Sequence, residues 1–313
     1  MYTLAEGQKN AVDEGNVMKA TIIELFRKSE LLDIMGFVDI PGNSYSYNLE
    51  ADAPAIAFRG VNESYTTSTG VINPQTEALR IAGGMIQLDR AQMKMLGEGV
   101  WARQVDMKTR ALAREIGRKM IKGDTTSNPR EFDGLQVRVP VTSTGSQHVA
   151  NSSSSGGAAL SLSKLDDAIN TVMDPTHIIM PRAMRPKWAK VQRSSTIAGN
   201  VNLDRENFGR PVMTYNDIPI VFADMPGKQT AALPFTETPA GGGTAQCSSA
   251  YILSVRESGV HGIQNGGMEV YDMGLVQEGV NRALQIEWLI ALVVEDPYAI
   301  CRLSSFTLAD IAA

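Results

Sequence analysis

Several short stretches of the sequence match patterns found in catalytic or nucleotide-binding sites. Residues 97–102 read GEGVWA, which fits the dinucleotide pattern G-x-G-x-x-A. That pattern requires a buried strand before it and another strand after the helix, whereas here DRAQMKML precedes it and a polar turn follows. Ser161–Lys164 fits S-x-x-K, but no S-D-N or K-T-G accompanies it. Gly227–Lys228 lacks the rest of a phosphate loop. We interpret the first stretch as a helix break and the second as a helix cap.

Residue types that commonly bind metals or act as nucleophiles do not form a recognisable site pattern in the sequence. His148, His177 and His261 are far apart and form no pair with metal-ligand spacing. Asp124 and Asn128 do not fit a calcium loop, because proline follows Asn128 where that loop needs glycine. A Ser–His–Asp site assembled from distant residues stays open, but no nucleophile elbow is present. The sequence therefore predicts a protein that is not an enzyme, with no catalytic residue, no cofactor and no metal site.

Composition indicates a globular chain. The 313 residues are 43% hydrophobic and carry a formal net charge of −5, which disfavours a general polyanion binder. Two cysteines, Cys247 and Cys301, favour a reducing compartment over a disulfide framework. The N-terminus has no apolar core typical of a secretory signal. The longest apolar run, residues 288–294, is too short to span a membrane. We expect a soluble protein that is intracellular when synthesised.

The first ninety residues predict an arm, a helix and a projecting hairpin. Residues 1–16 are polar and expected to be loose until something holds them. A helix is predicted over residues 16–35 by apolar residues at helical spacing, namely Met18, Ile22, Leu25, Phe26, Leu32 and Met35. Tyr45 and Tyr47 alternate with small polar residues, which is strand periodicity, and residues 77–90 predict a second strand. The connection between them is rich in Ser, Thr, Asn and Gly. Because an isolated hairpin is marginal in water, we expect this one to lie on a neighbour.

Residues 101–122 predict a long helix. Trp101, Val105, Leu112, Ile116 and Met120 fall on one face, and Gly123 suits the C′ position. Such a helix would be a rod of roughly 33 Å. Basic residues lie around the remainder of the helix surface: Arg103, Arg110, Arg114, Arg118 and Lys122.

The rest of the chain predicts mixed α and β structure. Residues 176–181, 218–224 and 250–256 are short apolar strands, and Ser163 is a plausible N-cap of a helix. Residues 283–303 give one long strand signal. The fold class predicted for the whole chain is therefore α+β.

The stretch that ends the long helix is similar to a turn of one protein family. KGDTTSNPREFDGL resembles the turn after the frame helix in the major capsid proteins of tailed bacteriophages, which share the Johnson fold. The matching residues are Gly123, Asp124, Asn128, Pro129, Phe132, Asp133, Gly134 and Leu135. The resemblance extends over roughly residues 40–305.

The resemblance implies a Johnson fold with five parts. Residues 1–40 would be an N-terminal arm and helix, and residues 41–92 the extended hairpin loop, with Tyr45, Tyr47, Arg59 and Arg80 as hairpin residues for assembly. Residues 93–135 would be a peripheral domain with the spine helix, and residues 136–275 an axial domain. Residues 276–313 would be the return strand of the peripheral domain and the C-terminus. The turn would be the hinge between the spine helix and the axial domain.

The resemblance also implies a function. The chain would be a coat protein that assembles as pentamers and hexamers into an icosahedral shell around double-stranded DNA. Its partners would include a portal, a cement protein and a separate scaffolding protein, since the hairpin begins too early to leave room for a built-in scaffold. It would be assembled in the bacterial cytoplasm, reside in the virion capsid, and contact no membrane. The alternatives are an encapsulin-like compartment shell and, as a different class, a soluble α/β hydrolase.

Two charge features add expectations. The helix segment from Arg103 to Lys122 has seven basic and two acidic residues. This is either a solvated face with i,i+4 pairs or, as the resemblance implies, an inner-surface face that moderates repulsion with packaged DNA. Some family members weld subunits through a hairpin lysine, but no lysine lies between Ser29 and Met93. We therefore expect a non-covalent shell.

Overall fold

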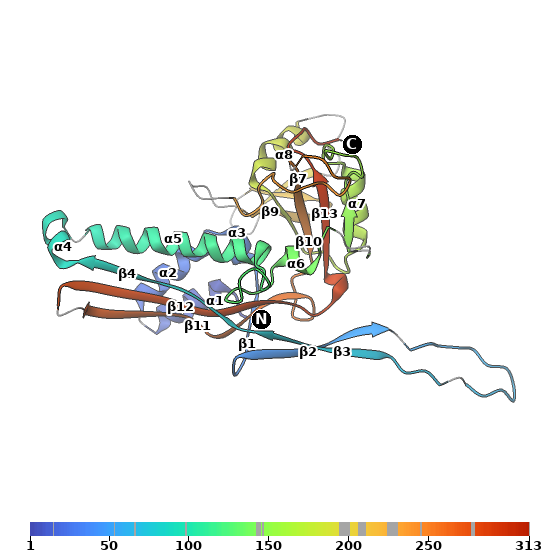
Figure 1. Cartoon of the computed structure of the whole chain (residues 1–313), viewed down its shortest axis with the longest axis horizontal. Helices are drawn as coiled ribbons and strands as arrows, with labels where there is room; N and C mark the ends of the chain where they lie inside the picture. The colour runs from blue at the N-terminus through green and yellow to red at the C-terminus, as the bar shows by residue number, and fades with distance from the viewer. Residues whose placement is uncertain are drawn as a thin grey trace.

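The computed structural model describes residues 1–14, 16–52, 54–65, 67–97, 99–141, 145, 147–193, 201–205, 211–223, 231–244, 246–276 and 279–312. It is a mixed α and β structure with two sheets and a projecting hairpin (Figure 1).

The first sheet has four strands in the order β1-β11-β12-β4. These are β1 (Phe37–Asp39), β11 (Val260–Val276), β12 (Asn281–Val294) and β4 (Arg80–Asp89). Side chains along β4 alternate, so that Ile86 and Leu88 are buried while Met85 and Gln87 are exposed. The buried face packs against the 24-residue helix α5 (Gly99–Lys122), which runs along the sheet in Figure 1.

The predicted long helix is confirmed. Trp101, Ile116 and Met120 are buried, and Val105 and Leu112 pack partly buried against the same core. The helix break predicted at residues 97–102 is also present. Gly97, which ends α4 (Arg90–Leu96), has a φ of +84°, a conformation that favours glycine. Glu98 lies outside the described residues.

The N-terminal segment, predicted to be loose until something holds it, is folded over Leu4–Asp13 and held to the first sheet at Tyr2. Helix α1 (Leu4–Asp13) begins with a capping box in which Thr3 and Glu6 bond each other's backbone N–H. Leu4 and Ala11 are buried, and the backbone of Tyr2 pairs with that of Phe37. The capping box, the two buried side chains and the backbone pair with Phe37 together stabilise this helix although most of its residues are polar.

The helix predicted over residues 16–35 is divided at Ser29 into α2 (Val17–Arg27) and α3 (Glu30–Ile34). Of its predicted apolar stripe, Ile22, Phe26, Leu32 and Met35 are fully buried, whereas Met18 is 37% exposed. Phe26 meets Trp288 of β12 edge-on, with ring centroids 6.0 Å apart. The N-terminal helices therefore close the core of the first sheet.

The second sheet has seven strands in the order β5-β13-β10-β6-β9-β8-β7. The strands are β5 (His148–Ala150), β6 (His177–Met180), β7 (Val201–Arg205), β8 (Pro211–Tyr215), β9 (Ile218–Phe222), β10 (Ser248–Leu253) and β13 (Ile300–Phe306). Helices α7 (Leu162–Asn170) and α8 (Arg185–Gln192) contact this sheet, whereas α6 (Leu135–Arg138) contacts the long helix α5. Two 3₁₀ turns, η1 (Arg182–Met184) and η3 (Pro297–Ala299), adjoin its strands. The N-cap of α7 is Ser161, two residues before the Ser163 that we predicted.

The strand predicted over residues 283–303 is two strands in different sheets, so that prediction is wrong. It breaks at η3, where Pro297 provides no N–H and the Asp296 carboxylate accepts the N–H of Tyr298 at 2.8 Å. Likewise, the predicted boundary at residues 275/276 does not separate the two sheets. β11 and β12 on its two sides pair with each other, and β13 returns to the second sheet.

The projecting hairpin consists of β2 (Ser44–Asp52) and β3 (Val71–Ala78), with Tyr47 opposite Gln75. Residues 77–90 were predicted as its second strand, but most of them form β4 of the four-stranded sheet. The change of sheet occurs at Leu79, which is buried and donates its N–H to the Asn43 carbonyl at 2.9 Å. Alternation of apolar residues cannot reveal such a change, because both strands have the same period.

Within the described residues, no helix is long and apolar enough to cross a membrane.

Candidate functional site: the hairpin, the turn and the helix face

Tyr45 and Tyr47, predicted as hairpin residues for assembly, hold the base of the hairpin to the body of the molecule. The Tyr45 hydroxyl donates to Oε1 of Glu295 at 2.5 Å, and its ring meets the His261 ring edge-on at 6.1 Å. The hydrogen bond to Glu295, helped by burial, raises the pKa of Tyr45 to about 12. The Tyr47 ring stacks on that of Tyr45 and is 9% exposed.

A second contact at the hairpin base involves residues that the sequence did not single out. Nη2 of Arg138 in α6 donates to Oε1 of Glu77 and to the carbonyl of Leu292, both at 2.8 Å. One guanidinium thus connects β3, β12 and the segment that follows the turn. Glu77 and Arg138 are 61 positions apart in the chain, so no spacing rule could have paired them.

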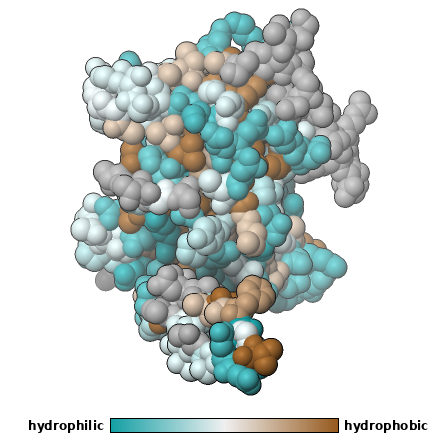
Figure 2. All heavy atoms as spheres, turned by 90° about the vertical axis from the view of Figure 1, so that its right-hand side faces the viewer, coloured by the Kyte–Doolittle hydropathy of each residue, from teal (hydrophilic) through white to brown (hydrophobic). Residues whose placement is uncertain are grey.

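The far end of the hairpin exposes apolar side chains. Ile56, Phe58 and Val61 are 90%, 102% and 92% exposed, and Tyr65 is 66% exposed. Arg59, another predicted hairpin residue, lies over the Tyr65 ring at 5.2 Å and donates to the Glu63 carbonyl. Figure 2 views the molecule from the side on which the hairpin projects and shows hydrophobic atoms at its protruding lower end. A projecting apolar loop of this kind is typical of a surface that binds another protein.

Arg80, the fourth predicted hairpin residue, lies in β4 and not in the hairpin. It pairs with Ile290 of β12, and its Nε donates to the Glu131 carbonyl at 3.1 Å. Arg80 therefore joins the four-stranded sheet to the turn that follows α5.

The predicted turn is built around two glycines whose backbones touch. The N–H of Gly134 donates to the Gly123 carbonyl at 2.9 Å. A Cβ on Gly123 would lie 2.2 Å from the Phe132 carbonyl oxygen, and one on Gly134 would lie 2.7 Å from the Ile121 carbonyl. Phe132 and Leu135 are buried in the core on either side. Only residues without a side chain allow the chain to fold back this tightly.

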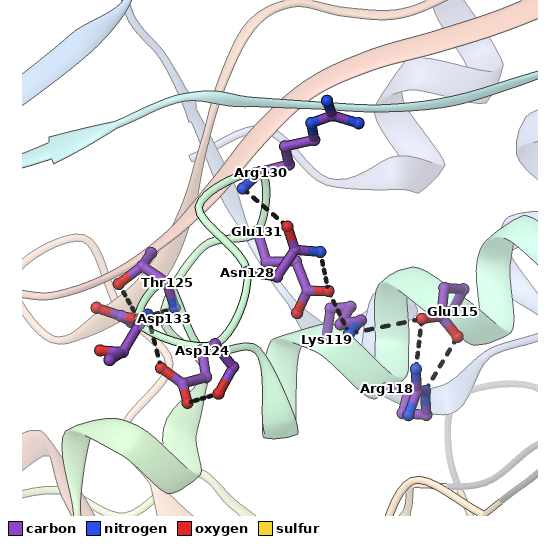
Figure 3. A network of polar contacts seen from close by, with 11 residues as sticks. Glu115, Arg118, Lys119, Asp124, Thr125, Asn128, Arg130, Glu131 and Asp133 are labelled. Carbon is purple, nitrogen blue, oxygen red and sulfur yellow. Dashed lines mark hydrogen bonds and ion pairs between the residues drawn. The ribbon is translucent and has the colours of Figure 1, made fainter.

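Polar side chains complete the turn (Figure 3). Oδ1 of Asp133 accepts the N–H and the hydroxyl of Thr125, both at 2.8 Å. Asp124 accepts the Ser127 hydroxyl at 2.6 Å and the Thr126 N–H at 2.8 Å, which lowers the pKa of Asp124. Each carboxylate therefore accepts hydrogen bonds from groups within the turn. Within the described residues, no group of three His, Cys, Asp or Glu could hold a metal ion.

The turn is also fastened to the end of α5. The Asn128 amide donates to Oε1 of Glu131 at 2.7 Å, just before Pro129 bends the chain, and Lys119 forms an ion pair with the same oxygen at 2.5 Å. Burial alone would raise the pKa of Glu131, but these two contacts outweigh it and the pKa is lowered. All eight residues of the predicted turn thus lie in one rigid connection between the helix and the second sheet.

The second sheet holds the other side of this connection through a buried arginine, Arg302 of β13, which is 1% exposed. Its guanidinium donates to the Val139 carbonyl at 3.0 Å, to Ser249 Oγ at 3.0 Å and to Oε2 of Glu237 at 2.9 Å. The sequence analysis missed this group, because its members come from distant segments. A single arginine in an otherwise apolar run, AICRL, was the available signal.

The basic side chains of α5 are partly neutralised on the helix itself. Nε of Arg110 donates to Asp106 at 2.9 Å, and Arg118 pairs with Glu115 at 2.6 Å. Arg103 is exposed, whereas Arg114, Arg118 and Lys122 are half-buried. Both expectations for this face remain compatible with the geometry, because it contains i,i+4 pairs and an excess of positive charge.

We predict that Gly134→Ala destabilises the chain by about 1–3 kcal/mol, since the new methyl group meets backbone that cannot move aside. Gly99→Ala is the matched control. Its Cβ would meet nothing within 4 Å at the start of α5, so it should be neutral or stabilise by about 0.5–1 kcal/mol. Urea unfolding of both variants measures the difference. Equal stability of the two variants would contradict the role given to the close backbone approach.

We predict that Glu237→Leu lowers the free energy of unfolding by about 3–5 kcal/mol, because it leaves the Arg302 guanidinium buried without its counter-ion. The double variant with Arg302→Met should lose less than the sum of the two single losses. Asp167→Ala, which breaks the exposed Lys164–Asp167 pair, should cost no more than about 1 kcal/mol. Strictly additive losses in denaturant unfolding would show that the pair is not coupled.

Comparison with known proteins gives matches in structure alone. No protein-family model matches the sequence, and no curated protein matches it. The holo-SrpI encapsulin complex from Synechococcus elongatus PCC 7942 has a similar chain, with a TM-score of 0.64, 13% identity, and 90% of this chain and 89% of that one covered. A native GTA particle capsid has a TM-score of 0.59, 14% identity and 90% coverage of both chains. A structure from Mycobacterium phage Adephagia has a TM-score of 0.59 and 14% identity, covering 85% and 84%.

These matches include nearly the whole chain and both sheets, at identities far below those that indicate shared function. The chain therefore has the Johnson fold, which the capsids of tailed phages and the shells of encapsulins have in common.

Proposed function

We propose that this chain is the major capsid protein of a tailed bacteriophage, a structural subunit that assembles into an icosahedral shell around double-stranded DNA. The observation that carries the proposal is the projecting hairpin on a Johnson fold. Its outer loop exposes Ile56, Phe58 and Val61 almost completely, a costly arrangement in a lone subunit. In a shell, these side chains would be covered by a neighbouring copy.

The division of the molecule supports assembly by overlap. The hairpin base is fixed by Tyr45 and Glu77, so the exposed loop is held at a set direction from the body. The first sheet with α5 would form the peripheral part of the subunit, and the second sheet the axial part, with pentamers and hexamers arranged around the axes. A separate scaffolding protein, a portal and a cement protein would complete a particle assembled in the bacterial cytoplasm.

The role proposed for the basic face of α5 is to moderate repulsion between the shell and packaged DNA. Arg103 and its neighbours would act on phosphates without reading sequence, so any contact should weaken as salt rises. Asp106 and Glu115 reduce the positive charge available, which favours a weak contact over tight binding.

An encapsulin-like shell is the second candidate, and it is supported by the structural match to the Synechococcus elongatus encapsulin chain, which stands beside the matches to phage and GTA capsids. Purified particles distinguish the two, because a phage capsid assembled with its portal and scaffold in an infected host would contain DNA, while a compartment shell would contain protein. Light scattering followed by electron microscopy tests the shared claim. Particles in the megadalton range are expected, and a monomer or dimer at every concentration and salt would overturn both candidates and favour the hydrolase.

We predict that replacing residues 54–69 by a short glycine-rich turn leaves a folded subunit that cannot close shells. The described side chains among the removed residues are exposed, so the free energy of unfolding should change by less than about 0.5 kcal/mol, while contacts to neighbours are lost. A control that keeps the length of the loop but replaces Ile56, Phe58 and Val61 by serine should fail in the same way. Normal shells from either variant would refute the assembly role of the loop.

We predict that the shell is held without covalent links between subunits. An isopeptide link from the hairpin would need a neutral lysine amine as nucleophile, and no lysine lies between Ser29 and Met93. Arg59 and Arg80 cannot substitute, since a guanidinium stays protonated. Mature particles boiled in detergent should give one band near 33.8 kDa. A ladder of multimers that survives a reducing agent would contradict the prediction.

A further inference from the structure

His261 is a fully buried, titratable side chain next to the base of the hairpin. It lies in β11 opposite Val293 of β12, and neither of its ring nitrogens has a hydrogen-bond partner within the described residues. Its ring is covered by the edge-on contact with Tyr45 of β2. A buried imidazole without a hydrogen-bond partner destabilises the folded chain. A state in which the imidazole gains such a partner is therefore favoured.

The groups that act electrostatically on His261 come from each neighbouring turn. They are Glu295 after β12, Glu257 before β11 and, more weakly, the N-terminal amine of the chain. Burial is the largest influence and lowers the pKa of His261, while the two carboxylates oppose it. The Tyr45 hydroxyl donates its hydrogen bond to Glu295, which is the same carboxylate that an imidazolium at His261 would attract.

We propose that His261, Tyr45 and Glu295 form an acid-sensitive latch that fixes the hairpin to the body. With neutral His261, Tyr45 packs on the ring and holds Glu295. When His261 takes a proton from solvent, the imidazolium competes for the Glu295 carboxylate, the Tyr45 bond breaks and the hairpin base is released at this one anchor. The latch is a property of the single chain and goes beyond the proposed shell role, where it would let acid change the direction in which the hairpin reaches a neighbour.

The direction of the pH effect follows from the lowered pKa of His261. Because the latched state binds the proton less readily than a solvent-exposed histidine does, acid favours release. The latch is intact near neutrality and weakens as the pH falls below the ordinary histidine range. The Glu77–Arg138 contact should persist there, so the hairpin loosens at one of its two anchors.

Hydrogen exchange of the purified chain tests the latch. Between pH 7.5 and 5.5, after correction for intrinsic exchange, protection of amides in residues 44–49 and 73–78 should fall by roughly tenfold, because loss of one anchor raises the population of locally opened states. His261→Gln cannot titrate and should abolish this pH response. The matched control, His177→Gln in β6 of the other sheet, should retain it.

Tyr45→Phe gives a second test if His261→Gln does not fold. It removes the phenol that holds Glu295 but leaves the ring against His261, so hairpin protection should already be low at pH 7.5 and change little with acid. An unchanged pH response in His261→Gln or Tyr45→Phe, or no response in the unaltered chain, would overturn the latch. None of these outcomes bears on whether the chain forms shells.

Discussion

The close backbone approach at Gly123 and Gly134 is the constraint on which the arrangement of the two sheets depends. The chain must turn away from the end of a long helix and still keep Phe132 and Leu135 in the core. It does so by bringing two backbone segments into direct contact, with the N–H of Gly134 donating to the Gly123 carbonyl. Carboxylates at Asp124 and Asp133 then bond the loop's own N–H and hydroxyl groups, so the turn is rigid without any help from a ligand.

Three buried or half-buried arginines connect the turn, the hairpin and the two sheets to one another. Arg80 joins β4 to the turn, Arg138 joins the hairpin to β12, and Arg302 joins the second sheet to the segment after the turn. Each guanidinium binds a backbone carbonyl, and two of them also bind a carboxylate. Arginine suits this role because its planar group donates in several directions at once and keeps its charge.

The contacts that fix the hairpin base and the exposed apolar loop at its far end both suit the proposed role in a shell. A hairpin can position its outer loop against a neighbour only if its base has a fixed direction, which Tyr45 and Glu77 provide. In the proposed shell, little entropy would then be lost on assembly, because the hairpin base is already held in place. The proposed latch acts at the same place, so a change at one anchor would alter the direction of the outer loop.

Local patterns in the sequence were sufficient for the spine helix, the break at Gly97 and the position of the turn, because each depends on neighbours within a few residues. The turn could be found since Gly123 and Gly134 are separated by a short loop with its own Asp and Asn. Only the tertiary structure decided that residues 80–89 leave the hairpin for another sheet, that residues 283–303 divide at Pro297, and that Leu4–Asp13 form a capped helix. Strand periodicity is the same in every sheet, and the side-chain partners of Arg138 and Arg302 lie more than fifty positions away, so these choices are made by packing and charge at long range.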